Sequence, residues 1–349
     1  MKRRTFLAAS TAAATASLFP AIIVRGQPGR GEILGQRDFQ YRVDEGWGVL
    51  DEDEATVKNC HGIVEAKDGR LILLTDEVKN NVIVYDGDCG CFDSAWTLDF
   101  PGAHGLSIVT EGEGKDQREV LFITDIRTSR FVKTTIEGEV LQRWGWPEDS
   151  GKYDREQQYK PSWTLHKPDG EFFVLDGYGK DYIQHFDKQG KQKNIFGGKE
   201  GGITHWGPHG GIYDGEGEDG GLLIAMSDQQ YLMKLDDEGN EKFRVQLPGG
   251  NPRQIQKAGD HYFVAHLADN WPKDRDSPGY ISVLDKDFKV VANLDGDSPK
   301  YDDDGKLQQM SARGKVFTHP HDLCVAKDGS VYVAQFMSGG TFPIKLERV

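Results

Sequence analysis

The chain has 349 residues and carries 56 acidic side chains against 42 lysines and arginines, for a formal net charge of −14 at pH 7. An acidic surface of this kind argues against nucleic acid as a partner, because nucleic-acid binding depends on basic patches. We therefore expect a small-molecule or peptide substrate, and a protein that works as a monomer.

Residues 1–27 have the pattern of a twin-arginine export signal. Arg3 and Arg4 precede Phe6-Leu7 and a long stretch rich in alanine, which is the order of a Tat-type signal. The alternative is a membrane anchor, but the stretch holds many alanine, serine and threonine residues and Pro20, so it is weakly apolar for that role. We expect cleavage within residues 21–27. Residues 28–349 would then form a periplasmic or extracellular domain that is not attached to the membrane.

Self-similar units follow one another through most of the remaining chain. Each begins with a short apolar strand and a turn marked by Asp-Gly, as at Asp68-Gly69 and Asp328-Gly329. A β-branched and aromatic strand, a polar loop and a third strand come next, and a fourth strand often follows. Asp-Gly between apolar runs is a strong hairpin signal. The units occupy residues 60–86, 104–145, 161–197, 208–247, 251–294 and 319–349.

Four strands in a unit of roughly 40–50 residues is the period of a β-propeller. We predict an all-β, six-bladed β-propeller with four-stranded antiparallel blades. A β-sandwich, the alternative architecture, would not predict a repeat of this length, whereas five or seven blades remain open. Residues 41–43 precede the first unit and are expected to close the ring by completing the last blade or its neighbour.

The four cysteines allow disulfides, because an exported protein meets an oxidising compartment. Cys89 and Cys91 are two residues apart, which we expect to be too close for a comfortable bridge. Cys60 and Cys324 lie in corresponding strands of the first and last units. If those units meet, a bridge between them would close the ring.

Histidines recur at the start of the units. In a propeller the first strand of each blade lines the central channel. Blades 2, 4 and 6 place His104, His209 and His321 there, about 120° apart by the sixfold geometry of the ring. Three converging imidazoles can hold a zinc ion and leave a fourth position for water or substrate, although copper, nickel or iron would also suit them. The alternative for each one is a histidine with a purely structural role.

Two more histidines belong to the candidate site. His61 opens the first unit and is expected to act as a fourth ligand, as a partner of the ligands or as a substrate contact, and His319 precedes Pro320 and His321. The other histidines have no matching position in the repeat, and we expect them to be structural. They are His166, His185, His205, His261 and His266.

Several runs resemble the peptidyl-α-hydroxyglycine α-amidating lyases, which are members of the wider group of NHL-repeat propellers. These runs are AHGLSIV at 103–109, FVLDGYGKDYIQHFDKQGK at 173–191, PHGGIYD at 208–214 and HPHDLCVAKDGSVYVAQ at 319–335. The resemblance implies a zinc ion held by three channel histidines, which works with a tyrosine to cleave a hydroxyglycine-extended peptide into an amide and glyoxylate. It assigns the zinc to His104, His209 and His321, the catalytic role to Tyr178, and a structural calcium ion to Asp322.

The sequence departs from the family where arginines bind the substrate carboxylate. The corresponding positions are Asp76 and Ser227 here, and His319 replaces a methionine. Arg253 is a channel residue of another blade that could supply the cation and contact the substrate. Two hypotheses follow. The first is an exported, zinc-dependent propeller lyase or hydrolase acting on a small polar substrate. The second is a non-catalytic NHL-type propeller that presents its rim to a protein or glycan partner.

Overall fold

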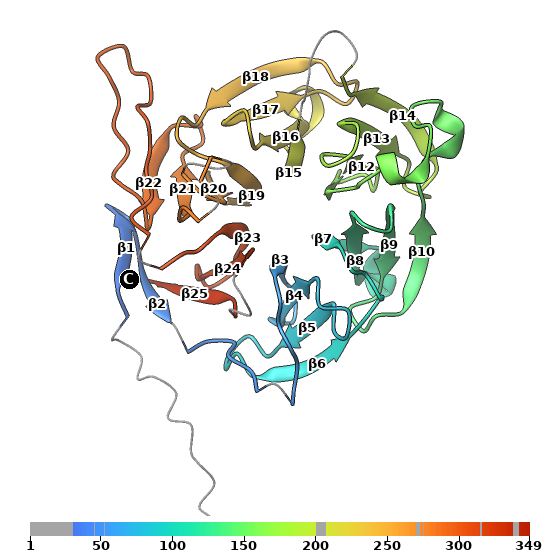
Figure 1. Cartoon of the computed structure of the whole chain (residues 1–349), viewed down its shortest axis with the longest axis horizontal. Helices are drawn as coiled ribbons and strands as arrows, with labels where there is room; N and C mark the ends of the chain where they lie inside the picture. Colours follow the sequence, from blue (N-terminus) through green and yellow to red (C-terminus); the bar gives the residue numbers. More distant parts are fainter. Residues whose placement is uncertain are drawn as a thin grey trace, which may run out of the picture.

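Six antiparallel β-sheets are arranged around a central channel in the computed structural model, which confirms the predicted six-bladed propeller (Figure 1). The structure describes residues 31–349 apart from 45, 52, 200–206, 270–272, 275, 315 and 338–341. The export signal expected at residues 1–27 and His205 therefore lie outside the described residues.

The strands follow the chain in blade order. Blade 1 holds β3 (Cys60–Glu65), β4 (Leu71–Thr75), β5 (Val82–Tyr85) and β6 (Phe92–Trp96). Blade 2 holds β7 (Ala103–Glu111), β8 (Arg118–Asp125), β9 (Arg130–Thr134) and β10 (Val140–Trp144). Blade 3 holds β11 (Trp163–His166), β12 (Phe172–Leu175), β13 (Tyr182–Phe186) and β14 (Gln192–Gly197).

The second half of the ring repeats this order. Blade 4 holds β15 (Pro208–Asp214), β16 (Gly221–Met226), β17 (Tyr231–Leu235) and β18 (Glu241–Gln246). Blade 5 holds β19 (Pro252–Ala258), β20 (His261–His266), β21 (Tyr280–Leu284) and β22 (Val290–Leu294). Blade 6 holds β23 (Pro320–Val325), β24 (Val331–Gln335), β25 (Ile344–Arg348), β2 (Phe39–Asp44) and β1 (Ile33–Gln36).

The middle strands of each blade are apolar because both of their faces are covered. The strand β4 has the sequence LILLT and is buried throughout, whereas the outer strand β18 has the sequence EKFRVQ and is largely exposed. Side chains of neighbouring sheets pack face to face, so that the core lies between blades. Predicted Asp-Gly turns are found at Gly69 and Gly329, which adopt φ of +92° and +87°, a region that favours glycine.

An N-terminal strand closes the ring, as the sequence predicted. The strand β2 pairs with β25 and brings Val43 opposite Leu346. The strand β1 then adds a fifth strand to blade 6. The first and last segments of the described chain therefore share one sheet, which gives the closure many backbone hydrogen bonds without a covalent link.

The cysteine predictions were wrong. Cys89 and Cys91 form a disulfide, because the turn at Gly90 (φ +63°) brings their Cα atoms to 5.2 Å, within the usual range for a bridge. Cys60 and Cys324 do lie on neighbouring inner strands and in one apolar cluster, as the repeat predicted, but both remain buried thiols.

The first unit extends further than its predicted end at residue 86. The strand β6 completes blade 1 and pairs with β5. Its sequence, FDSAW, is short and has two adjacent polar residues, both exposed, so it lacks the apolar alternation that identifies a strand.

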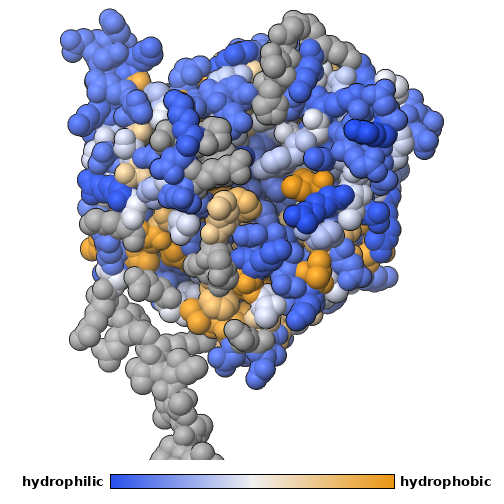
Figure 2. Space-filling model, viewed as in Figure 1, coloured by the Kyte–Doolittle hydropathy of each residue, from blue (hydrophilic) through white to orange (hydrophobic). Residues whose placement is uncertain are grey.

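The face of the molecule seen in Figure 1 is mostly hydrophilic, with apolar side chains in scattered patches (Figure 2). Within the part of the chain that the structure describes, no helix has the length and apolar character needed to cross a membrane.

Candidate functional site

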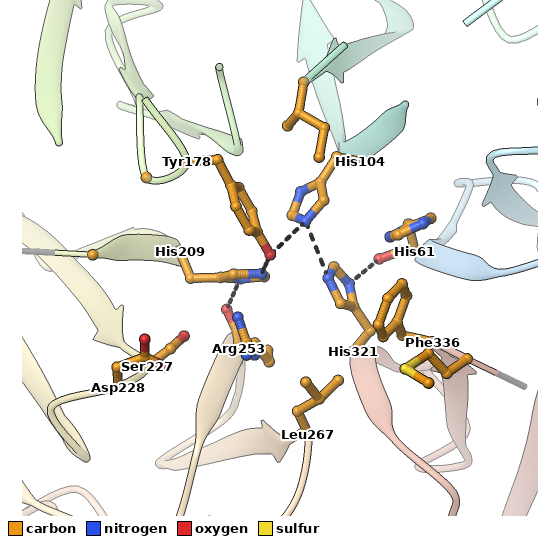
Figure 3. A pocket seen from close by; sticks show the side chains of 14 residues that line it. His61, His104, Tyr178, His209, Ser227, Asp228, Arg253, Leu267, His321 and Phe336 are labelled. Carbon is orange, nitrogen blue, oxygen red and sulfur yellow. Dashed lines mark hydrogen bonds between the residues drawn. The ribbon is translucent and has the colours of Figure 1, made fainter. Parts of the chain in front are cut away.

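A cavity of about 600 Å³ opens into the central channel (Figure 3). Its lining includes four histidines, one tyrosine and one arginine. These are His61, His104, His209, His321, Tyr178 and Arg253. All are residues that the sequence placed in the site, and the structure brings them together from blades that are far apart in the chain.

Irregularities in the inner strands aim these side chains at the channel. In five of the six inner strands the pairing register shifts where the strand begins, which leaves one extra residue on the inner strand. A bulge of this kind reorients a side chain. The residues at the shifts are His61, His104 (with Gly105), His209, Arg253 and His321.

Blade 3 contributes differently. Its inner strand β11 pairs with β12 without a register shift. Trp163, which opens this strand, packs in the core between blades 3 and 4. The blade instead supplies Tyr178 from the loop between β12 and β13, and the hydroxyl of this tyrosine points toward the histidines (Figure 3).

Three of the histidines are held in the same way. Nδ1 of His104 lies 2.9 Å from the carbonyl oxygen of Ser162, and Nδ1 of His209 lies 2.9 Å from that of Arg253. Nδ1 of His321 lies 2.7 Å from the carbonyl oxygen of His61. A carbonyl can only accept, so each Nδ1 carries the proton and each Nε2 of a neutral ring keeps its lone pair. Each acceptor belongs to the next blade around the ring.

A glycine follows two of these histidines, and its lack of a side chain explains how closely the histidine approaches the carbonyl group of the next blade. A Cβ on Gly105 would lie 2.4 Å from the carbonyl oxygen of Ser162, and a Cβ on Gly210 would lie 2.5 Å from that of Arg253. These are the carbonyl groups that accept from His104 and His209.

The three Nε2 atoms face one another in the channel. His104 Nε2 and His321 Nε2 are 3.2 Å apart, and the ring centroids of His104, His209 and His321 are 4.7 to 4.9 Å apart. The hydroxyl oxygen of Tyr178 lies 3.0 Å from His209 Nε2 and 3.3 Å from His104 Nε2.

Burial keeps these rings neutral. It lowers the pKa of His104, His209 and His321 well below the usual value, and the charges of neighbouring histidines and of Arg253 lower each pKa further. Two unprotonated nitrogens at 3.2 Å repel each other unless a cation lies between them. Two nitrogen ligands of a tetrahedral zinc ion, each bound at 2.0–2.1 Å, are separated by about 3.3 Å. The spacing of His104 and His321 therefore fits two ligands of a first-row metal ion.

His61 gives a second possible ligand set. Among the described residues, the ligand atoms of His61, His104 and His321 all lie within 4.8 Å of one another. His61 Nδ1 is buried and has no hydrogen-bond partner in the described part of the chain, and Nε2 lies 3.8 Å from a carboxylate oxygen of Asp76. The two sets share His104 and His321. We favour His209 as the third ligand, because its Nδ1 is fixed to a carbonyl like theirs.

Ser227 and Asp76 occupy the positions where the amidating lyases have arginines; Ser227 lines the cavity, and Asp76 lies beside His61. Ser227 donates to the carbonyl oxygen of Pro252 at 2.6 Å. Burial tends to raise the pKa of Asp76, but hydrogen bonds from His61 and Asn59 outweigh it and lower this pKa to about 2.

Arg253 places a positive charge in the cavity, and its side chain is 6% exposed. His319 is buried at the start of the same blade as His321 but is not among the residues that line the cavity. Tyr178 is 40% exposed as a whole, and its hydroxyl lies against the buried imidazoles of His104 and His209. Desolvation there raises the pKa of Tyr178, an effect that the charge of Arg253 opposes.

Asp322 lies on the other side of the histidine ring. It accepts hydrogen bonds from the backbone N–H groups of Ile63 and Leu323 at 2.9 and 2.8 Å, and burial raises its pKa to about 8. It lines a second channel cavity of about 330 Å³ together with Gln254, whose buried Oε1 has no hydrogen-bond partner among the described residues. Carboxylate and amide oxygens are ligands that Ca²⁺ prefers.

Sequence reasoning missed the apolar part of the site. Ile126, Leu267, Phe336 and Met337 line the cavity from loops that follow the second strand of a blade. Tyr178 occupies the corresponding loop of blade 3, so its position was the signal that could have identified the others. The histidines expected to be structural are not among the lining residues: His166, His185, His261 and His266.

Comparison with known proteins adds the fold alone. No protein-family model matches the sequence, and a search of curated proteins found no match. A streptogramin B lyase is 13% identical with a TM-score of 0.56, over 84% of this chain and 94% of that one. The virginiamycin B lyase of Staphylococcus aureus is 11% identical with a TM-score of 0.51, over 84% and 98%. A protein of unknown function from Bacteroides thetaiotaomicron is 12% identical with a TM-score of 0.55, over 84% and 70%.

Proposed function

We propose that this chain is an exported, metal-dependent propeller lyase whose active site is the cavity at the histidine ring. The observation that carries the proposal is the convergence of three unprotonated Nε2 atoms beside the hydroxyl of Tyr178. Structural histidines would satisfy both ring nitrogens with protein groups. Here, among the described residues, the only protein donor within reach of these Nε2 atoms is the hydroxyl of Tyr178, whose single proton can satisfy only one of the three rings.

His104, His209 and His321 would hold the metal, for which zinc is our first choice. When bound, zinc supplies a Lewis acid that polarises an oxygen of the substrate. Tyr178 holds a proton at its hydroxyl oxygen, within hydrogen-bond distance of two imidazole nitrogens, and can exchange it with the substrate.

The other lining residues define the substrate. Arg253 would bind an anionic group of the substrate. It would replace the arginines that the amidating lyases have where this chain has Asp76 and Ser227. Leu267 and Phe336 present apolar surface that keeps water away from the reacting bond. His61 would contact the substrate or the metal ligands. His319, two residues before His321 in the chain, would support that ligand. The substrate class is therefore a small anion that also carries an apolar group.

The closest chemistry to test is that of the amidating lyases, in which an α-hydroxyglycine derivative releases glyoxylate. We expect the zinc-loaded protein to release glyoxylate from α-hydroxyhippurate. Quinupristin belongs in the same assay, because a virginiamycin B lyase with the same fold has been crystallised with it. Tyr178→Phe should retain zinc and lose at least about 100-fold in turnover.

Turnover that is equal in the wild type and in Tyr178→Phe would contradict the proposed role of the tyrosine. A protein that binds zinc and turns over neither substrate would favour the second candidate, a non-catalytic propeller with a protein or glycan partner. The observation behind that candidate is the loss of positive charge at positions 76 and 227.

Three further proposals accompany this function. Calcium would bind at Asp322 and stabilise the channel on the side opposite to the histidines. The twin-arginine pattern of residues 1–27 would direct the chain to the periplasm or beyond. The mature protein would act as a monomer.

A further inference from the structure

The loop that carries Tyr178 is built around one buried carboxylate. Asp176 directly follows the second strand of blade 3 and has no exposed surface. One of its carboxylate oxygens accepts from the backbone N–H of Lys160 at 2.6 Å. The other accepts from the backbone N–H of Lys180 at 2.8 Å and from the hydroxyl of Tyr153 at 2.8 Å. The carboxylate therefore joins both ends of the Tyr178 loop to the segment that precedes blade 3.

The backbone of Asp176 closes the same loop. Its carbonyl oxygen accepts from the N–H groups of Gly179 at 3.0 Å and of Asp181 at 3.1 Å. Three hydrogen bonds to the side chain and two to the carbonyl thus converge on one residue, two positions before Tyr178. A loop with so many fixed points holds its central side chain in one place.

The glycines on each side of Tyr178 allow close contacts of the loop backbone that a side chain would prevent. A Cβ on Gly177 would lie 1.8 Å from the carbonyl oxygen of Pro208, and a Cβ on Gly179 would lie 2.0 Å from a carboxylate oxygen of Asp176. The loop is therefore pressed against the residue before His209 on one side and against Asp176 on the other.

We propose that Asp176 is the positioning residue of the site, which fixes the hydroxyl of Tyr178 between the imidazoles of His104 and His209. This inference rests on the proposed function for its catalytic consequence, but the placement of Tyr178 can be measured without turnover. A displacement of about 1 Å in a catalytic group costs about 100-fold in rate, which is the size of effect expected when Asp176 is replaced.

The test uses the full chain with 3-fluorotyrosine incorporated, and the fluorine resonance of Tyr178 is assigned by its loss in Tyr178→Phe. Asp176→Asn preserves shape but replaces one of the two acceptor oxygens by an NH₂ group, which cannot accept a hydrogen bond. We expect the Tyr178 resonance to move and broaden while the zinc content stays equal to that of the wild type. Turnover of an accepted substrate should fall about 100-fold with little change in KM.

Asp295 provides a matched control away from the site. It is 2% exposed, and it accepts from the backbone N–H groups of Val316 and Phe317 at 2.8 and 3.1 Å. Asp295→Asn loosens a loop that contributes none of the residues lining the cavity, so the Tyr178 resonance should stay in place. If Asp176→Asn does not fold, Tyr153→Phe removes one of the three donors and should produce a smaller shift in the same direction.

An unchanged Tyr178 resonance in folded Asp176→Asn would overturn the proposal, and so would an equal shift in Asp295→Asn. Failure of the proposed function looks different, because the protein would then show no turnover in any variant while the fluorine signal still reported the position of Tyr178.

Discussion

Each proposed metal ligand is held by a backbone carbonyl in the next blade. The Nδ1 contacts of His104, His209 and His321 differ by no more than 0.2 Å, from 2.7 to 2.9 Å. A carbonyl acceptor fixes both the tautomer and the orientation of a ligand histidine. His61 lacks this contact, and our preference for His209 as the third ligand rests on that structural difference.

We therefore predict that His209→Ala abolishes stoichiometric zinc binding, whereas His61→Ala still binds one zinc ion with an affinity weakened by no more than about 10–100-fold. Isothermal titration calorimetry of the two variants measures the difference. The reverse ranking, with His61 indispensable and His209 dispensable, would assign the metal to the set His61, His104 and His321.

At the scale of elements, the ring depends on strand β2. Val43 is 3% exposed and packs in the cluster that joins blades 5 and 6. We predict that Val43→Asp lowers the free energy of unfolding by about 3 kcal/mol or more, because it buries an unpaired carboxylate. Chemical denaturation measures this change. Gln40→Asp is the control, since Gln40 is exposed on the same strand and should change stability by less than about 0.5 kcal/mol.

A buried ion pair links blades 4 and 5. Asp214 on β15 contacts Lys234 on β17 at 2.8 Å and Lys257 on β19 at 2.6 Å. Burial acts to raise the pKa of Asp214, but the two lysines outweigh it and lower this pKa below the usual value. Asp214→Ala would leave Lys234 buried without its partner and should cost roughly 3 kcal/mol.

The sign of the pH dependence follows from the lowered pKa. A carboxyl whose pKa is lower in the folded state contributes stability above its unfolded pKa, and this contribution is lost as the pH falls through the folded value. The stability difference between the wild type and Asp214→Asn should therefore be constant near neutral pH and shrink below about pH 4. A difference that grows on acidification would contradict this account.

For the whole molecule, the repeat made the architecture predictable. Matched positions in six units gave the blade number, the channel location of His104, His209 and His321, and closure by the segment around Val43. These features depend on periodicity, which a sequence displays directly.

Local geometry was not predictable in the same way. The pairing of Cys89 with Cys91 depends on a turn with positive φ at Gly90, and β6 has too few apolar residues to be recognised. The register shifts that aim the histidines and the carboxylate contacts of Asp176 exist only in three dimensions. A sequence shows which side chains share a position, but not which backbone groups will meet them.

The most direct test of the central claim is the zinc content of the purified mature protein, measured by elemental analysis after dialysis against zinc. We predict about one zinc ion per chain for the wild type and none for the double variant His104→Ala with His321→Ala. A wild-type protein that retains no zinc, or a double variant that retains as much as the wild type, would contradict a metal centre at the histidine ring.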